Sequence, residues 1–234
     1  ATFSTVVLPE TAGSAGSKTT HVALLARAAE VYAAVSYIPA DGGSATVDVY
    51  RSLDSGGTWS VAAAVGPGSL PLRLSAEPFG ERLFLVTGES LLTSSSKGLA
   101  WAKLTTLRSR HHAVAAAATE VWVGGDFGLE RVPINGGSAS VQVAGPSTQH
   151  FWDIAASSVY DVYAVGPAGV FRHDGSNQLW STLLLAEGMS GVVAGTAGST
   201  TQRTVIAAGS RSLYRSTNGA DFSPTASISE SESR

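Results

Sequence analysis

The sequence contains no cysteine, one methionine and little charge. Without cysteine, a disulfide framework, a Cys-x-x-Cys zinc site and a cysteine nucleophile are all excluded. Charged residues make up 14% of the 234 residues, against about 25% in an ordinary globular domain. The formal net charge is -3 and there is no basic run, which excludes a nucleic-acid binder that acts through counterion release. No stretch approaches about 18 continuous apolar residues, so the sequence predicts no membrane span.

The residues that are abundant indicate a folded protein outside the cytoplasm. Apolar residues make up 44% of the chain, enough to bury a sizeable core. Alanine, glycine, serine and threonine are frequent and lysine is rare, and the chain opens at Ala1 without a charged-then-apolar leader, as a mature secreted form or an excised piece would. We therefore expect a secreted, periplasmic or cell-surface protein, with residues 227–234 as a polar tail.

Aromatic residues that follow a Gly/Ser/Asn-rich turn reveal an internal repeat. Trp59, Trp101, Trp180 and Phe222 follow such turns, with spacings of 42, 79 and 42 residues, and 79 is about twice 40. The missing member is expected near residue 141, where the turn Asn-Gly-Gly-Ser-Ala-Ser precedes Val141. Short β-branched or aromatic runs recur in one phase of the same period, at residues 30–33, 82–85, 120–123, 161–164 and 204–207. Each run reads as a buried strand.

Four short strands fit into each repeat, which predicts an all-β fold, a β-propeller of about five four-stranded blades. In the second repeat we expect strands at residues 72–77, 82–88, 90–95 and 100–106. The expected blades are residues 20–66, 70–107, 111–145, 150–186 and 189–226, together making one propeller over residues 1–226. Residues 3–8 match the phase of a fourth strand and either close the ring or are extra. We expect five blades that close into a ring within the chain. The alternative is that the chain forms part of a six- or seven-bladed ring.

The turn before the fourth strand carries a specific motif. Residues 52–59 read Ser-Leu-Asp-Ser-Gly-Gly-Thr-Trp, a full match to the Asp-box pattern S-x-D-x-G-x-T-W. Residues 94–101, 173–180 and 216–222 are partial matches. In such a turn the Asp or Asn side chain caps backbone N–H groups, so we expect Asp54 to be a turn cap rather than a catalytic acid or metal ligand. The residues assigned to this structural role are Ser52, Asp54, Gly56, Trp59, Ser96, Gly98, Trp101, Asp174, Gly175, Trp180, Asn218, Gly219 and Phe222.

With these turns the chain resembles the Asp-box (BNR-repeat) β-propellers. That group includes sialidases, xyloglucanase-like glycosidases, sortilin-type receptors and photosystem assembly factors. Residues 152–154, 161–166 and 173–175 are also similar to propeller repeats of large secreted bacterial proteins. The resemblance covers nearly the whole chain. It implies the fold and leaves the function open, because enzymes and binding proteins share it.

The alternation of strands predicts where a binding site would form. The start of a blade's first strand and the end of its second lie at one end of the blade, and the Asp-box turn lies at the other. Polar and aromatic residues gather at the first of these ends: His21, Arg73, Glu89, His111, His112, Asp126, His150, Trp152 and Asp153. They predict either a polar pocket for a glycan, an anion or a metal, or merely the polar lining of a solvent channel. Because His111 and His112 are adjacent on a strand, only one of them can face the pocket.

The sequence favours binding over catalysis. It has no Ser-His-Asp motif, no phosphate loop and no arginine set of the sialidase kind. We therefore predict a non-catalytic binding or scaffold module that recognises a carbohydrate or a protein, with no cofactor, no metal and no nucleic-acid partner. The alternative is a glycoside hydrolase that uses a carboxylate pair, with Asp153 and either Asp126 or Glu89 as its members.

Overall fold

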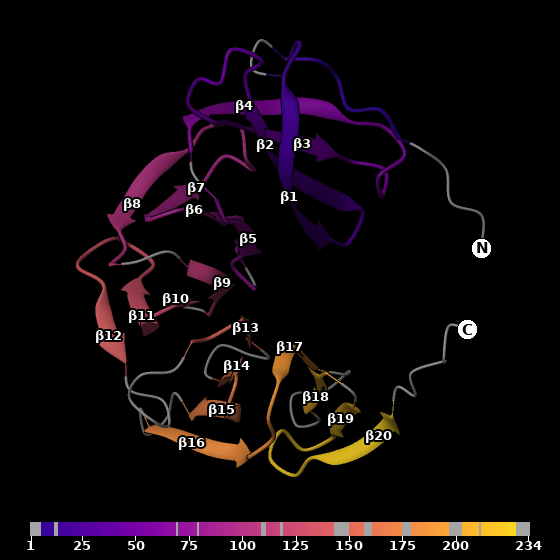
Figure 1. Cartoon of the computed structure of the whole chain (residues 1–234), viewed down its shortest axis with the longest axis vertical. Helices are drawn as coiled ribbons and strands as arrows, with labels where there is room; N and C mark the ends of the chain where they lie inside the picture. The colour runs from indigo at the N-terminus through magenta and orange to yellow at the C-terminus, as the bar shows by residue number, and fades with distance from the viewer. Residues whose placement is uncertain are drawn as a thin grey trace. The chain divides into compact units, whose positions relative to one another are not determined.

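The structure is a computed structural model. It describes residues 6–11, 14–68, 70–78, 80–108, 111–117, 119–142, 150–156, 161–174, 179–196, 203–210 and 212–227. These residues form five four-stranded antiparallel sheets and no helix, which confirms the predicted all-β propeller fold (Figure 1). The sheets are blades 1 to 5 below. None of the described residues belongs to a helix long and apolar enough to span a membrane. The chain divides into two compact units, residues 1–110 and residues 111–234, called unit 1 and unit 2.

Unit 1 contains blades 1 and 2. Blade 1 consists of β1 (Lys18–Arg27), β2 (Glu30–Ile38), β3 (Thr46–Ser52) and β4 (Ser60–Pro67). Blade 2 consists of β5 (Leu72–Ala76), β6 (Leu83–Thr87), β7 (Ser90–Ser94) and β8 (Ala102–Thr106). Each blade-2 strand lies inside the range that the sequence predicts for it. Every residue of β6 is buried.

An apolar cluster joins the two blades of unit 1. It contains Ala23, Ala34, Val47 and Val49 of blade 1 with Leu72 and Leu85 of blade 2. Burying a large aliphatic side chain of this kind contributes roughly 1.5–3 kcal/mol. The other face of blade 1 packs against the N-terminal segment, since Leu8 lies on the cluster that contains Tyr37 and Tyr50. The hydroxyl of Thr11 donates a hydrogen bond to the buried carboxylate of Asp48. Of the strand expected at residues 3–8, residues 6–8 form no strand and residues 3–5 lie outside the described ones.

Unit 2 contains blades 3, 4 and 5. Blade 3 consists of β9 (His111–Ala116), β10 (Glu120–Gly125), β11 (Gly128–Pro133) and β12 (Ser140–Gln142). Blade 4 consists of β13 (Asp153–Ala156), β14 (Asp161–Gly166), β15 (Gly169–Asp174) and β16 (Leu179–Leu184). Blade 5 consists of β17 (Met189–Thr196), β18 (Arg203–Gly209), β19 (Ser212–Ser216) and β20 (Ser223–Ser227). The fourth strand of blade 5 therefore comes from its own repeat.

Two apolar clusters hold unit 2 together, one on each side of blade 4. The first joins Trp122 and Leu129 of blade 3 to Phe171 of blade 4. The second joins residues of blade 4 to Val205 and its neighbours in blade 5. The Tyr163 hydroxyl donates to the Gly219 carbonyl at 3.1 Å. A Cβ on Gly219 would lie 2.4 Å from that hydroxyl, and φ there is +74°, so the position requires glycine.

An ion pair recurs between the second and third strands of three blades. A carboxylate at the start of the second strand contacts an arginine of the third: Glu30–Arg51 at 2.6 Å, Glu120–Arg131 at 3.3 Å and Asp161–Arg172 at 2.7 Å. Asp161 is 1% exposed and also contacts Arg203 of blade 5 at 2.7 Å, so it links two blades. The other two pairs stay within their own blade.

The turn of blade 1 that carries the Asp-box sequence is closed by hydrogen bonds within itself. One carboxylate oxygen of Asp54 accepts from the Thr58 N–H at 2.8 Å and the Ser52 hydroxyl at 2.7 Å, and the other accepts from the Thr58 hydroxyl at 2.8 Å. The Trp59 indole N–H donates to the Gly56 carbonyl at 3.0 Å. These contacts fold the indole back over its own turn.

The corresponding turns of blades 2 and 5 are also closed by hydrogen bonds within themselves, with Ser96 and Asn218 in the place of Asp54. In blade 2 the Ser96 hydroxyl accepts from the Ala100 N–H at 2.9 Å, and the Trp101 indole donates to the Gly98 carbonyl at 3.0 Å. In blade 5 the Asn218 side chain accepts from the N–H groups of residues 220 and 221, both at 2.9 Å. In blade 4, Gly175 lies outside the described residues.

Candidate binding site

A β-bulge at the start of β9 positions the first candidate residue. Gly124 pairs with Ala113 and Gly125 pairs with His111, so His112 is the extra residue between them. A bulge turns a side chain away from the regular alternation of a strand. His111 is accordingly 1% exposed, whereas the side chain of His112 is 27% exposed. The same irregularity occurs at the start of the first strand in blades 1 and 5, at Thr20 and Ser190.

Asp126 enters the site from a tight turn. Gly125 pairs with Gly128, so Asp126 and Phe127 are the two residues that connect β10 and β11. The Asp126 carboxylate accepts a hydrogen bond from Nε2 of His112 at 2.7 Å and one from Nδ1 of His150 at 3.3 Å. One carboxylate oxygen, Oδ1, thus accepts hydrogen bonds from two imidazoles, one in β9 of blade 3 and one in the segment before β13 of blade 4.

Backbone hydrogen bonds fix the segment that carries His150 and Trp152. The Phe151 N–H donates to the Gly125 carbonyl at 3.1 Å, and the Trp152 N–H donates to the Val165 carbonyl at 2.9 Å. The imidazole of His150 stacks on the indole of Trp152, with ring centroids 5.6 Å apart and an interplanar angle of 10°. The His112 ring is tilted by 46° against the same indole at 5.7 Å. We call His112, Asp126, His150 and Trp152 the histidine–tryptophan cluster.

The cluster is accessible to solvent, and its hydrogen bonds favour the ionised form of the Asp126 carboxylate. The hydrogen bond from His112 is the main cause that lowers the pKa of Asp126 below its usual value, and the bond from His150 acts in the same direction. Trp152 is 41% exposed, so a large apolar ring stays at the surface beside this carboxylate. Such an arrangement can bind a partner by stacking and by hydrogen bonding at once.

The other residues of unit 2 that the sequence assigned to this site make contacts inside blade 3 and between blades 4 and 5. His111 contacts Glu130 at 2.8 Å inside blade 3, where both side chains are buried. The two carboxylate oxygens of Asp153 accept from the backbone N–H groups of Ile154 at 3.0 Å and Val192 at 2.9 Å. Asp153 therefore ties blade 4 to blade 5.

In unit 1 the structure brings together a different pair. The guanidinium of Arg73 lies 3.1 Å from Nε2 of His21 and donates to its neighbour's carbonyl, that of Leu72, at 2.8 Å. Burial is the main cause that lowers the pKa of His21, and the charge of Arg73 adds to it. Glu89, the remaining candidate, lines a pocket between blades 1 and 2.

Sequence reasoning missed Phe127, which directly follows Asp126 and is 79% exposed. The signal was present, because a large apolar side chain at a two-residue turn has nothing to pack against. Within the part of the chain that the structure describes, no three His, Cys, Asp or Glu side chains are arranged to hold a metal ion.

Comparison with solved structures places the chain among β-propellers. YCF48 bound to a D1 peptide matches with a TM-score of 0.57 and 12% identity, over 92% of this chain and 69% of that one. A nidogen/laminin complex matches with a TM-score of 0.59 and 9% identity, over 92% of this chain and 81% of that one. An α-L-arabinofuranosidase from Fusarium graminearum, in complex with an iminosugar inhibitor, matches with a TM-score of 0.56 and 9% identity. The match covers 88% of this chain and 80% of that one.

These similarities bear out the resemblance to propellers of mixed function. At such identities they establish the fold, which binding proteins and a glycosidase share. No family model matches the chain, and no curated protein sequence matches it.

Proposed function

We propose that this propeller is a non-catalytic binding module that recognises a protein partner through the histidine–tryptophan cluster. The observation that carries the proposal is the Trp152 ring, which is 41% exposed and stacked on His150. A large aromatic side chain that is already held in place loses little conformational freedom on binding. Such residues contribute most of the energy at protein interfaces.

Two neighbouring features support a partner that approaches this surface. Both hydrogen bonds from the imidazoles end on Oδ1 of Asp126, and among the described residues none ends on Oδ2. That oxygen is available to accept from a donor of the partner. Phe127, 79% exposed in the same turn, adds apolar area beside it. An aromatic centre with polar groups around it is the usual composition of a protein-binding patch.

A protein partner also agrees with two of the similar propellers, which are described in complex with a D1 peptide and with laminin. A carbohydrate is the second candidate, because an exposed indole beside a carboxylate can also stack on a sugar ring. Hydrolysis is less well supported, since the Asp153 carboxylate is engaged by two backbone N–H groups. The abundance of alanine, glycine, serine and threonine and the scarcity of lysine favour a location outside the cytoplasm.

The test is an unbiased peptide selection on the whole chain. A phage-displayed random peptide library is selected on the wild-type protein, and the enriched peptides are synthesised and titrated by isothermal calorimetry. We expect Trp152→Ala to weaken their binding about tenfold or more. Asp54→Ala is the control, because its contacts stay within its own turn. Enriched peptides that bind the Trp152→Ala variant equally well would contradict the proposal.

A parallel panel of plant and bacterial oligosaccharides separates the other candidates. Binding of an oligosaccharide without turnover, lost in Trp152→Ala, would replace the protein partner by a glycan. Turnover of any member that Asp153→Asn abolishes would make the chain a hydrolase instead. Neither result is expected.

A further inference from the structure

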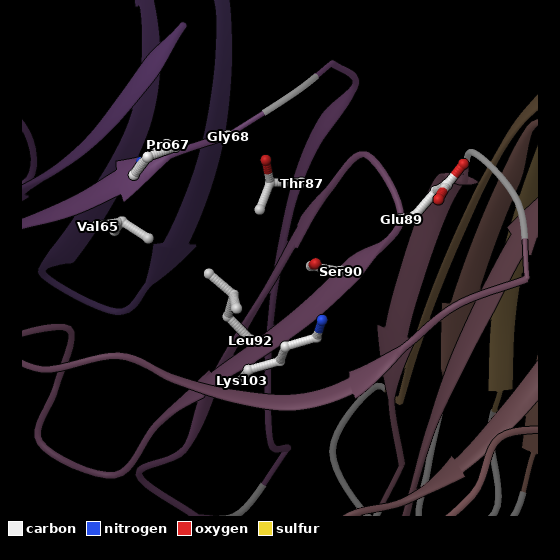
Figure 2. A pocket seen from close by; sticks show the side chains of 8 residues that line it. All are labelled: Val65, Pro67, Gly68, Thr87, Glu89, Ser90, Leu92 and Lys103. Carbon is white, nitrogen blue, oxygen red and sulfur yellow. The ribbon is translucent and has the colours of Figure 1, made fainter. Parts of the chain in front are cut away.

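A pocket of about 530 Å³ lies between blades 1 and 2 in unit 1, outside the histidine–tryptophan cluster. Its volume falls within the usual range for small-molecule sites, roughly 300–1,000 Å³. Figure 2 shows the side chains that line it, with Val65 on one side and blade-2 residues on the other.

The apolar side of the pocket continues the core of unit 1. Val65 of β4 and Leu92 of β7 both pack against the cluster that joins blades 1 and 2. Leu92 pairs with Leu85 of β6, which belongs to that cluster. The apolar interface thus ends at the pocket with two aliphatic side chains that can contact the C–H groups of a ring.

The polar side follows from the register of blade 2. Thr87 pairs with Ser90, and Leu92 pairs with Lys103, so these side chains share the face of the sheet that Leu92 presents to blade 1. Thr87 is buried, whereas Ser90 is half-buried and Lys103 is exposed. Two hydroxyls and an ammonium therefore line the pocket from one face of one blade.

The charges in the pocket are arranged for an anionic group. In Figure 2 the Lys103 side chain runs along Leu92 and its ammonium points toward Ser90. None of the ion pairs recorded among the described residues includes Lys103. Glu89 also lines the pocket, at the far edge in Figure 2, with its carboxylate directed away from Lys103. A ligand with a carboxylate at the Lys103 side and hydroxyl groups elsewhere complements this pattern.

We propose that this pocket binds an acidic monosaccharide unit, a hexuronate. Lys103 and Ser90 hold its carboxylate, Thr87 and Glu89 hydrogen-bond its hydroxyl groups, and Val65 with Leu92 contact the ring. The composition of the lining favours a sugar acid over a purely apolar acid, because hydroxyl, ammonium and carboxylate groups line the pocket beside Val65 and Leu92. The proposal is independent of the proposed protein-binding function.

The test compares two ligands that differ at one carbon. Glucuronate carries a carboxylate where glucose carries a hydroxymethyl group, so the pair isolates the contribution of Lys103. Binding is followed by NMR titration of the whole chain at millimolar ligand, at low ionic strength. We expect glucuronate to bind about tenfold more tightly than glucose, because a charge-assisted hydrogen bond contributes that much.

Variants then locate the site. Lys103→Gln should weaken glucuronate binding about tenfold, whereas Lys103→Arg should retain it. Lys97→Gln is the matched control, because Lys97 pairs with Glu81 at 3.2 Å and lines another pocket of unit 1. The exposed position of Lys103 means that its substitution should leave the melting temperature unchanged.

Three outcomes would overturn the proposal. These are no glucuronate binding by the wild type, equal binding of glucose and glucuronate, and binding that Lys103→Gln leaves intact. Trp152→Ala should not affect glucuronate binding, so failure here and failure of the proposed protein-binding function are distinguishable.

Discussion

Asp54 and Asp126 are both solvent-accessible carboxylates at turns, yet their hydrogen bonds differ in origin. Asp54 accepts from Ser52 and Thr58 of its own turn, which lowers its pKa to about 2, with the Thr58 backbone N–H as the largest cause. Asp126 accepts from imidazoles 14 and 24 residues away, and its pKa is also lowered. The depressed pKa alone does not separate the two roles. The sequence distance of the donors does, because local donors close a turn whereas distant donors assemble a surface.

The comparison extends to a third carboxylate that is fully buried. Asp161 holds Arg172 and Arg203, the second of which belongs to another blade. We expect Asp161→Ala to lower the free energy of unfolding by about 3–5 kcal/mol, because it leaves two arginines without their buried counter-charge. Chemical denaturation followed by tryptophan fluorescence measures the change.

Glu120 provides the matched control for Asp161. It occupies the same place in blade 3 and contacts Arg131 at 3.3 Å, but both side chains are partly exposed. Glu120→Ala should cost at most about 1 kcal/mol. Equal losses for the two variants would show that the link between blades 4 and 5 contributes nothing.

The local character of Asp54 predicts a loss of stability without a loss of binding. Asp54→Ala leaves the Thr58 N–H and two hydroxyls without their acceptor, so the melting temperature should fall. The melting temperature of Asp54→Ser should lie between those of the wild type and Asp54→Ala. The equivalent Ser96 of blade 2 still accepts a hydrogen bond from a backbone N–H group. Differential scanning fluorimetry ranks the three proteins. An unchanged melting temperature in Asp54→Ala would refute the structural role.

Two histidines of unit 2 extend the comparison to pH. His173 lies against Trp122 and Trp180, and burial is the main cause that lowers its pKa below 6.5. The unfolded state then binds more protons between the folded and unfolded pKa values, so stability falls as the pH drops below the unfolded pKa.

We expect His173→Phe to reduce the loss of melting temperature between pH of about 7 and about 5. The loss is not abolished, because the pKa of His21 is lowered as well. His112→Phe, in the exposed cluster, is the control for replacing a histidine by phenylalanine. A slope that His173→Phe does not alter would assign the acid sensitivity to other groups.

The smallest expected effect comes from completing the turn of blade 2. Ser96→Asp supplies the carboxylate that blade 1 has, but Ala100 stands where blade 1 has Thr58 and offers no hydroxyl. We expect a gain of about 0.5 kcal/mol in the free energy of unfolding. Ser96→Asp combined with Ala100→Thr should gain more than Ser96→Asp alone, and an equal gain would contradict the role of the hydroxyl.

The fold was predictable because the repeat is visible in apolar residues, and these residues must be buried in any folded form of the chain. The second strands are near-continuous apolar runs at one phase, and β6 lies within one residue of its expected range at each end. The last repeat follows the same period of about 40 residues in its first strand, its turn and its fourth strand. What the period could not decide was whether the segment at residues 3–8 would form a strand.

The composition of the site was predictable only in part. His112, Asp126, His150 and Trp152 were all candidates, but so were residues that the structure uses otherwise. Their grouping depends on the bulge at His112 and on the Phe151 N–H bond to Gly125, neither of which has a sequence signature. In the structure the Asp153 carboxylate accepts from two backbone N–H groups, and the sequence does not distinguish such a carboxylate from one that binds a ligand.

The most direct test of the account is a crossed measurement on two variants, Trp152→Ala and Asp54→Ala. Melting temperature and the affinity for the enriched peptides are measured on both. The account predicts that Trp152→Ala loses affinity about tenfold or more at nearly unchanged melting temperature, and that Asp54→Ala loses melting temperature at unchanged affinity. If Trp152→Ala kept its affinity while Asp54→Ala lost it, the assignment of the binding surface and of the structural turn would be reversed.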